Sequence, residues 1–234
     1  MKVTLTRVTQ NPILAIEEAA SNCYDSQPTT DGRIMKACYE SGHQSVLEFA
    51  DFTFHIEGIS RACSHQLVRH RVASYAQRSQ RYVEEDNFNY IIPDSINNNM
   101  EALAKYTQTM HNVCECYSYL KNLGIPAEDA RMILSNACET IIEVKMNGRS
   151  LIHFMNERLC TRAQWEIRNV AKAMKQVVMN HDEECAKFAQ LFVPKCYAHT
   201  KYPFCTEHKS CGLAPQLKDI YAVYLTSKEG DKHE

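Results

Sequence analysis

The chain has 234 residues, of which 44% are hydrophobic and 23% are charged, and its formal net charge is −2 at pH 7. This length supports one globular domain with a substantial core. General binders of nucleic acid or membrane surfaces are usually basic, so the acidic balance disfavours both classes. No run approaches the roughly 20 apolar residues that span a bilayer. Eleven cysteines without a secretion signal favour free thiols in a reducing cytoplasm.

Before residue 58 the sequence predicts a strand, two helices and a second strand. Alternating apolar residues indicate the strands, and apolar residues on one face indicate the helices. The strands are expected around 3–8 and 52–56, and the helices over 13–23 and 32–40. A polar turn over 41–45 separates the second helix from the second strand.

The segment from 58 to 83 contains five arginines and no aspartate or glutamate. Guanidiniums are planar forks that match phosphate and carboxylate oxygens. Because no carboxylate within the segment can pair them, the sequence predicts that they bind an anion from outside it. A solvated basic face is the plainer alternative, since charge patterning alone is weak support.

The arginine-rich segment is predicted to begin as a helix and to end as a loop. Ser60 can cap the helix. Arg61, His65 and Arg69 would share one face of it. The residues over 70–82 are too polar for a core helix and predict a ligand-contacting loop. Their serine, glutamine and tyrosine side chains can hydrogen-bond the phosphate, sugar and base of a nucleotide.

After this segment the sequence predicts further helices and one strand. The strand is expected over 140–146, and the helices over 94–123, 127–134, 149–155 and 165–192. No internal repeat or linker is evident. The expected fold is α+β, a single domain with a mixed or antiparallel sheet flanked by long helices.

A second group of arginines follows in the C-terminal half. If Asn147 is a helix N-cap, the first turn of that helix presents free amides and a positive dipole end to an anion. Gly148 would permit close backbone approach, and Arg149 would reach the anion. An ordinary cap with surface arginines is equally consistent. The group comprises Arg131, Arg149, Arg158 and Arg162.

Other candidates give weaker signals. His43 lies in the polar turn, and His153 lies four residues after Arg149 on the same helix face. A lone histidine is more often a structural group than a ligand. No glycine-rich phosphate loop of the Rossmann or P-loop type is present. No serine or cysteine stands in a recognisable nucleophile context, and Cys63 and Cys160 near the arginines are expected to be inert.

The C-terminal segment has a possible metal-ligand pattern. Cys196, Cys205, His208 and Cys211, with His199 between them, offer three thiols and imidazole for zinc. The spacing is irregular for a zinc knuckle. We therefore expect free thiols and no metal site, and a zinc-stapled interaction protein is a minor alternative.

The most specific pattern is Arg69-His70-Arg71, followed after seven residues by Ser79 and then by Arg81-Tyr82. It resembles the signature of the flavin-dependent thymidylate synthases. The segments 41–48, 52–55 and 147–167 resemble that family in the same order. The resemblance covers 1–195, which we expect to be the family domain, and leaves 196–234 as a Cys/His-containing extension. Many members of the family have glutamate where this chain has Gln77, and a few have asparagine where it has His153.

The resemblance implies an enzyme that makes dTMP from dUMP. FAD would be the cofactor, 5,10-methylenetetrahydrofolate the carbon donor and NADPH the reductant. Active sites would form where the subunits of a homotetramer meet. The residues implied to hold FAD are His43, Ser45, Arg69, His70, Arg71, Gln77, Asn147, Gly148, Arg149 and His153. Those implied to hold dUMP are Gln66, Leu67, Val68, Arg69, Gln77, Arg78, Ser79, Gln80, Arg81, Arg131 and Arg158.

By the same resemblance, Arg158 is the catalytic residue. It matches the arginine that favours ionised N3 of the uracil ring, a preorganised positive charge where negative charge develops. Hydride transfer is the chemistry of the cofactor. The mechanism therefore needs no protein nucleophile, which agrees with the absence of a recognisable one. No nucleic-acid or membrane partner is expected. The alternative is a non-catalytic nucleotide- or RNA-binding protein that uses the basic patch from Arg61 to Arg81.

Overall fold

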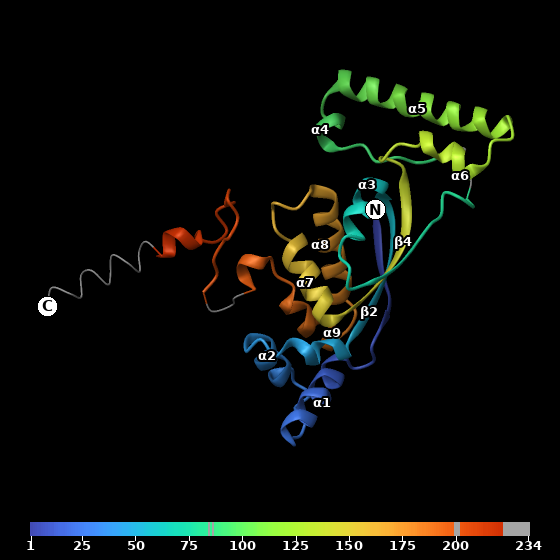
Figure 1. Ribbon diagram of the computed structural model, residues 1–234. Coiled ribbons are helices and arrows are strands. Elements are labelled where there is room, and N and C mark those ends of the chain that lie inside the picture. The colour runs from blue at the N-terminus through green and yellow to red at the C-terminus, as the bar shows by residue number, and fades with distance from the viewer. Residues whose placement is uncertain (84, 86, 199–201, 222–234) are drawn as a thin grey trace. The chain divides into compact units, whose positions relative to one another are not determined.

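The computed structural model describes residues 1–83, 85, 87–198 and 202–221. Four strands form one sheet in the order β1-β2-β4-β3 (Figure 1). The pairing is antiparallel, so the predicted α+β class with an antiparallel sheet is confirmed. The strands are β1 (Lys2–Val8), β2 (Asp51–Ser60), β3 (Ser74–Gln77) and β4 (Glu139–Asn147).

The helices vary widely in length. The α-helices are α1 (Pro12–Tyr24), α2 (Arg33–Glu40), α3 (Arg61–Leu67), α4 (Asp94–Asn97), α5 (Met100–Asn122), α6 (Ala127–Ala130), α7 (Gly148–Arg158), α8 (Trp165–Met179) and α9 (Glu183–Phe188). Short 3₁₀ helices are η1 (Gln44–Phe49), η2 (Arg131–Ile133), η3 (Ala189–Leu191) and η4 (Lys195–Tyr197). In the described ranges, no helix combines the length and the apolar character needed to cross a membrane.

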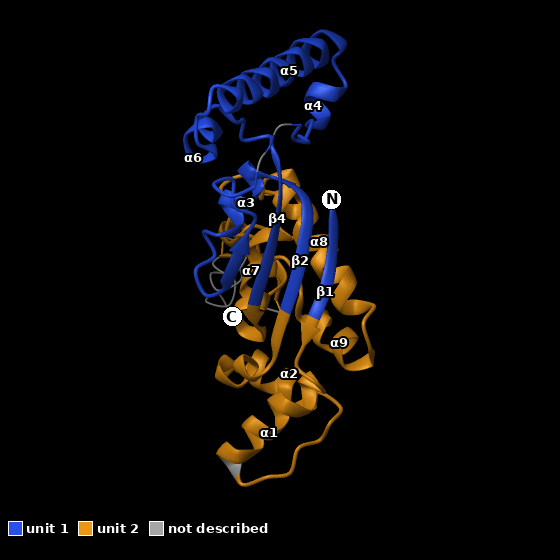
Figure 2. Ribbon diagram, turned by 90° about the vertical axis from the view of Figure 1, so that its right-hand side faces the viewer, with its two compact units in different colours: residues 1–6, 53–145 blue, residues 7–52, 146–234 orange. Residues whose placement is uncertain are grey.

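The chain divides into two compact units, which Figure 2 colours separately. Unit 1 comprises residues 1–6 and 53–145, and unit 2 comprises 7–52 and 146–234. Unit 1 contains β3 and the helices α3 to α6. Unit 2 contains α1, α2, α7, α8, α9 and the C-terminal segment. The predicted boundary between a family domain over 1–195 and an extension over 196–234 stays a prediction. Residues 222–234 and His199 lie outside the described residues.

Local patterns explain several elements. In β2, Phe54 and Ile56 are fully buried, whereas the intervening residues are partly exposed, as expected for a strand with one covered face. The hydroxyl of Ser60 accepts a hydrogen bond from the Cys63 amide at 3.0 Å and caps α3, as predicted. Asn147 caps α7 in the same way through the Ser150 amide.

Two helices predicted as continuous are interrupted. The predicted helix over 94–123 ends first at Asn97, and Asn99 then caps α5 through the Ala102 amide at 3.1 Å. The predicted helix over 165–192 ends at Met179, and Asp182 caps α9. Short polar side chains compete for backbone amides and stabilise a new helix start. Apolar periodicity alone does not reveal such breaks.

The segment after α3 also differs from its prediction. The helix ends at Leu67, so Arg69 lies beyond it and does not share a helix face with Arg61. The residues predicted as a loop include β3, in which Ser74 pairs with Lys145 and Gln77 pairs with Ile142. β3 lies at the edge of the sheet. An edge strand tolerates polar side chains, which explains why its composition resembled that of a loop.

Gly148 packs more closely than any other residue type could. An added Cβ would lie 2.6 Å from the Leu47 carbonyl oxygen and 2.8 Å from Cζ of Phe188. The Gly148 amide donates to the Ala50 carbonyl at 2.7 Å. The start of α7 is thereby fixed against η1 and α9 within unit 2.

Replacing Gly148 with alanine should destabilise the protein. The added methyl group meets a backbone carbonyl, which cannot move as a flexible side chain can, so we expect a loss of about 1–3 kcal/mol. Urea unfolding followed by circular dichroism measures it. Lys172→Ala, an exposed substitution on α8, is the control. Equal midpoints for Gly148→Ala and wild type would contradict this account of the packing.

Candidate functional site

The first arginines of the motif lie in a turn that follows α3. The amides of Arg69 and His70 donate to the carbonyls of Gln66 and Leu67 at 3.3 and 3.1 Å. The Tyr75 hydroxyl lies 2.9 Å from the Leu67 carbonyl and 2.7 Å from the His70 carbonyl. Tyr75 on β3 therefore holds the turn that presents both arginines, a role that sequence reasoning missed.

The sequence predicted that the arginines of the acid-free segment are available to an outside anion, but two of them pair with carboxylates of the chain. The Arg81 guanidinium contacts Glu128 of α6 with Nη2 and Nε each at 3.0 Å. The Arg78 guanidinium lies 3.6 Å from the buried carboxylate of Glu85. Glu85 lies just after the segment, whereas Glu128 is distant in sequence, so its contact with Arg81 could not be read from the local sequence.

Three other arginine side chains have no partner within the described parts of the chain. Arg69 and Arg71 lie in the exposed turn, and Arg158 lies in the last turn of α7, partly exposed. No hydrogen bond or ion pair to a described residue involves their guanidiniums. A guanidinium without an internal partner can bind an anionic ligand without first breaking an ion pair.

Two members of the predicted dUMP set meet at α6. Arg81 binds the carboxylate of Glu128, while Nε of Arg131 donates to the Glu128 carbonyl at 3.1 Å. One residue thus holds two arginines that are fifty positions apart in sequence. This brings together two guanidiniums that could bind one phosphate.

The remaining members of the dUMP set differ in exposure. Gln66 and Ser79 are partly exposed, and Val68 is exposed. Leu67 and Gln80 are buried, so their side chains belong to the interior of unit 1. The Ser79 hydroxyl accepts from the Arg81 amide at 3.2 Å and shapes the turn that carries Arg81.

Gln77 is fixed by two hydroxyls. Its Nε2 donates to Oγ of Ser64 at 2.8 Å and to Oγ1 of Thr140 at 3.1 Å. Ser64 donates its own hydroxyl proton to the Arg61 carbonyl at 3.0 Å. The amide orientation of Gln77 is therefore set by the network, and its Oε1 is the atom left to accept from a ligand.

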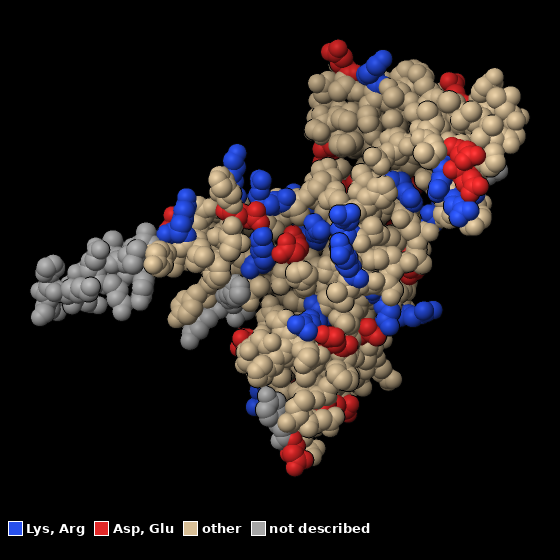
Figure 3. Space-filling model, in the orientation of Figure 1, with Lys and Arg blue, Asp and Glu red and all other residues tan. Residues whose placement is uncertain are grey.

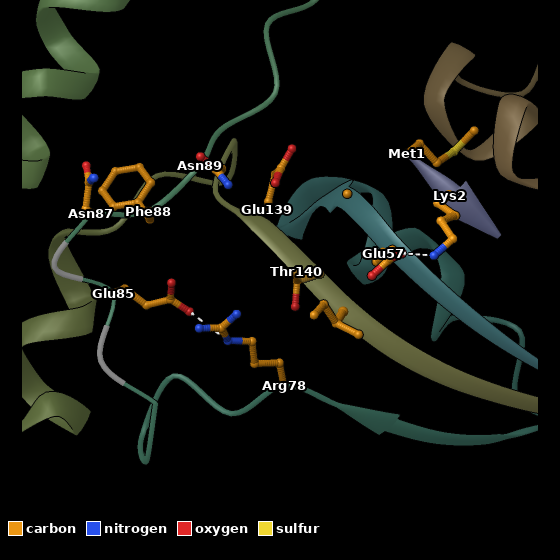
Figure 4. A pocket seen from close by; sticks show the side chains of 12 residues that line it. Met1, Lys2, Glu57, Arg78, Glu85, Asn87, Phe88, Asn89, Glu139 and Thr140 are labelled. Atoms are coloured by element: carbon orange, nitrogen blue, oxygen red, sulfur yellow. Dashed lines mark ion pairs between the residues drawn. The ribbon is translucent and has the colours of Figure 1, made fainter. Parts of the chain in front are cut away.

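A pocket in unit 1 contains Arg78 and is lined by charges of both signs (Figure 4). Its volume is about 520 Å³. Figure 4 shows Arg78 and Glu85 pointing toward each other, with Thr140 beside them. Glu57 and Glu139 also line it. Lys2 pairs with Glu57 at 3.0 Å and Arg78 with Glu85, so a phosphate bound here would compete with carboxylates for both cations.

Arg61 is in neither of the residue sets that the family resemblance assigns to FAD and dUMP, and its contacts are structural. Its Nη1 donates to the Arg78 carbonyl at 3.4 Å, and its amide donates to the Cys138 carbonyl at 2.9 Å. Burial and the nearby positive charge of Arg131 lower the pKa of Arg61, and Glu85 opposes them. Burial raises the pKa of Glu85, whereas Arg78 and Arg61 lower it.

In unit 2 the predicted FAD residues surround the start of α7. Asn147 caps the helix, and Arg149 in its first turn pairs with Glu48 of η1 at 2.8 Å. His43 is the residue before η1, and Ser45 is exposed on η1. The sequence predicted that Gly148 would let an anion approach the backbone. In the structure Gly148 is buried, and the groups that lie close to it belong to η1 and Phe188.

A pocket of about 1120 Å³ lies beside these residues in unit 2. Gln44, next to His43, lines it together with His153 and Asn156 of α7. Oδ1 of Asn156 is buried, and no described residue donates to it. Tyr202 and Phe204 of the C-terminal segment add aromatic surface. The pocket combines apolar walls with a free acceptor, which suits a heterocyclic ligand.

The predicted FAD set is divided between the two units. His43, Asn147, Arg149 and His153 belong to unit 2, whereas the turn from Arg69 to Arg71 belongs to unit 1. That these groups meet around one ligand stays a prediction. In Figure 3, Lys and Arg side chains lie in small groups with Asp and Glu side chains beside several of them. The positive charge is therefore local, as the net charge indicated.

Sequence reasoning missed four residues that shape the site. Tyr75, Glu128, Glu48 and Asn156 hold or line its parts, yet none belongs to the motif. Glu48 alone carried a signal, since it follows His43 and Ser45 in the segment that resembles the family. The contacts of the other three depend on pairing between distant segments.

Residues 4–182 match the family model described as "Thymidylate synthase complementing protein". The chain belongs to this family. It is 46% identical over 190 residues to the flavin-dependent thymidylate synthase of Geobacter sulfurreducens, which covers 76% of this chain and 82% of that protein. It is 41% identical over 223 residues to the flavin-dependent thymidylate synthase of Pyrococcus furiosus, with 88% and 90% covered. The resemblance found in the motif is thus confirmed.

A third relative is the flavin-dependent thymidylate synthase of Clostridium tetani. The identity is 36% over 248 aligned positions, which cover 94% of this chain and 97% of that protein. The family model ends before α9, whereas the Clostridium alignment extends over nearly the whole chain. The C-terminal segment therefore lies outside the family model but not outside the relatives.

Tyr75→Phe should loosen the arginine turn. The substitution removes a hydrogen bond shared by two carbonyls and costs about 1 kcal/mol. We expect the amides of Arg69 and His70 to exchange hydrogen faster, measured by mass spectrometry. Tyr197→Phe, which removes a hydroxyl bonded to the Leu213 carbonyl at 2.9 Å, is the control. Unchanged exchange at the turn would show that Tyr75 does not hold it.

Proposed function

We propose that the chain is a flavin-dependent thymidylate synthase, which reductively methylates dUMP to dTMP. In this reaction 5,10-methylenetetrahydrofolate supplies the carbon and NADPH supplies the hydride, leaving tetrahydrofolate and NADP⁺. The observation that carries the proposal is that Arg69, Arg71 and Arg158, in a chain of this family, have guanidiniums without partners in its described parts. These are three of the positions that the motif assigns to the two phosphorylated ligands.

The residues present suit FAD. The pocket of unit 2 offers aromatic walls, and the buried Oδ1 of Asn156 can accept from an N–H of a flavin ring. The amides of Gly148 and Ser150 are already bonded to the Ala50 carbonyl and to Asn147, so a phosphate there would rely on the positive dipole end of α7 and on Arg149. When bound, FAD would supply the hydride chemistry. The residues that would hold it are His43, Ser45, Arg69, His70, Arg71, Gln77, Asn147, Gly148, Arg149 and His153.

The dUMP phosphate would bind the guanidiniums held at α6. Arg81 and Arg131 both contact Glu128, so the arginines are held in place before the phosphate arrives. Preorganised groups lose less entropy on binding. Oε1 of Gln77 would accept a hydrogen bond from the nucleotide. Arg78 pairs with the buried carboxylate of Glu85, so its contact to dUMP stays the weakest part of the assignment.

Arg158 would act on the uracil ring. A guanidinium held near N3 stabilises the ionised ring, which makes the opposite side of the ring more nucleophilic. No described residue pairs with the Arg158 guanidinium, so within the described ranges its charge is available to the ring. No serine or cysteine needs to attack the ring in this mechanism.

We also propose that the enzyme works in the cytoplasm as a homotetramer, with active sites where subunits meet. This assembly would explain how residues of unit 1 and unit 2 serve one FAD, because different subunits can contribute them. Nucleic acid and membranes are not expected partners. A non-catalytic nucleotide- or RNA-binding protein is the alternative, and it would carry no flavin.

The first test is the absorbance spectrum of the purified protein together with dTMP formation. We expect the bands of oxidised flavin and turnover that requires dUMP, methylenetetrahydrofolate and NADPH. Arg158→Ala should lower turnover by at least about 100-fold, since it removes a charge that stabilises the transition state. The circular dichroism spectrum should not change, because the side chain is partly exposed and unpaired.

Arg33→Ala is the matched control, because Arg33 is exposed on α2 and pairs with Asp31 at 2.7 Å. It should turn over at the wild-type rate. A colourless protein that fails to bind added FAD would contradict the proposed function. Normal turnover of Arg158→Ala would leave the function intact and overturn the role of Arg158.

A second test concerns the partner of Arg81. Glu128→Gln keeps a hydrogen-bond acceptor beside Arg81 but removes the negative charge that competes with phosphate. Because the pair is half exposed, its strength is at most about 1 kcal/mol, so we expect dUMP to bind about 2- to 5-fold more tightly. Calorimetry measures the dissociation constant. Glu183→Gln, which breaks an exposed pair with Lys187, should leave it unchanged, and weaker binding by Glu128→Gln would contradict the competition.

A further inference from the structure

Four cysteine thiols surround one small cavity in unit 2. Cys160 lies in the loop between α7 and α8, and Cys196 lies in η4. Cys205 and Cys211 follow in the C-terminal segment. The cavity has a volume of about 10 Å³, which is close to that of one water-sized sphere. The tertiary fold thus adds a fourth thiol to the three that the sequence pattern contained, and His208 does not line the cavity.

The same cavity is lined by charged side chains. Two cationic residues, Arg162 and Lys195, line the same cavity. Lys195 pairs with Glu207, which also lines the cavity, so Arg162 is the positive side chain left among the lining residues to offset thiolate charge.

The C-terminal segment has a very small apolar core. Its buried residues form a cluster of Cys196, Cys205 and Ala214. Backbone bonds add to it, since the Phe204 amide donates to Cys196 and the Cys205 amide donates to Pro215. Three small side chains bury little area, and short segments with so little core are usually stapled by a disulfide or a metal. All eleven cysteines are thiols in the structure.

We propose that Cys160, Cys196, Cys205 and Cys211 bind one Zn²⁺ ion, which ties the C-terminal segment to the loop between α7 and α8. Four thiolates complete the tetrahedral coordination of a structural zinc site. Thr161 and Leu213 line the same cavity as Cys211 and can donate hydrogen bonds to thiolate sulfurs held there. Such hydrogen bonds orient and stabilise the ligands of metal sites.

Zinc binding would draw the thiols closer together. Zn–S bonds of about 2.3 Å at tetrahedral angles place sulfurs about 3.8 Å apart. Among the described residues, the ligand atoms that all lie within 4.8 Å of one another belong to His181, Asp182 and Cys185, so the four thiols are spaced more widely. Cys211 is exposed, and the segment around it can move inward without disturbing a large core.

The cluster of His181, Asp182 and Cys185 has a structural explanation. Asp182 caps α9, and its Oδ1 accepts from the Cys185 amide at 2.7 Å. Burial and the Asp182 charge raise the pKa of Cys185 to about 12. The Asp182 carboxylate is thus engaged as the cap, and the group offers one thiol, whereas the cavity offers four, so zinc is assigned to the four-thiol cavity.

The zinc site has a consequence for the pocket beside His153. The segment that it fixes supplies Tyr202, Phe204 and Leu217 to that pocket. Zinc would therefore hold one wall of the site in which we propose that FAD binds. This consequence rests on the proposed function, whereas the presence of zinc does not.

The test is the metal content of the full-length protein, produced with added Zn²⁺ and purified without chelators. We expect about one zinc per chain after extensive desalting, measured by mass spectrometry of the metal. Cys205→Ser and Cys211→Ser should each lower the zinc content by at least about 5-fold. Because Cys211 is exposed, its variant should fold even if Cys205→Ser does not. Cys116→Ser on α5 is the control and should retain zinc.

A second readout uses Co²⁺ in place of Zn²⁺. Tetrahedral thiolate coordination should give intense cobalt bands at wavelengths beyond flavin absorption, and Cys211→Ser should lose them. Less than about 0.1 zinc per chain after desalting would overturn the proposal. Full zinc retention by Cys211→Ser or a disulfide among the four cysteines would also overturn it. Zinc without flavin would leave the metal site standing and contradict the proposed function.

Discussion

The contact of Gly148 with the Leu47 carbonyl is the constraint on which the organisation of unit 2 depends. With a Cβ only 2.6 Å from that oxygen, no side chain can occupy the first position of α7. The glycine lets η1 lie directly against the start of the helix. As a result the turn that carries His43 and the helix that carries Arg149 and His153 are parts of one packed structure. A ligand bound there meets residues whose separation is fixed by backbone contact.

The arginines are divided by what lies beside them in the fold. Arg81, Arg78 and Arg149 are matched by Glu128, Glu85 and Glu48. Arg69, Arg71 and Arg158 have no such partner in the described residues. The matched guanidiniums are held in position and must exchange one anion for another, whereas the unmatched ones carry uncompensated charge. Positioning and charge are thus supplied by different members of the same set.

Features set by residues that are close in sequence were predictable, whereas contacts between distant segments were not. The caps by Ser60 and Asn147 and the alternation in β2 are local, and the sequence predicted them correctly. The edge strand β3 was missed because its polar side chains resemble those of a loop. The partners of Arg81 and Arg78 were missed because they come from other segments. The motif identified the family, but it could not reveal that Tyr75 supports the turn or that Cys160 joins three distant cysteines.

Hydrogen bonds between distant segments also explain why glutamine suits position 77 of this chain. Many members of the family have glutamate at this position. Here Ser64 uses its hydroxyl proton on the Arg61 carbonyl, so it presents a lone pair to residue 77. Nε2 of Gln77 satisfies that lone pair at 2.8 Å. A carboxylate in the same place would face an acceptor, unless Ser64 rotated and left the Arg61 carbonyl without its donor. Since Arg61 in turn contacts the Arg78 carbonyl, glutamine at this position is matched to the side chains that support Arg78.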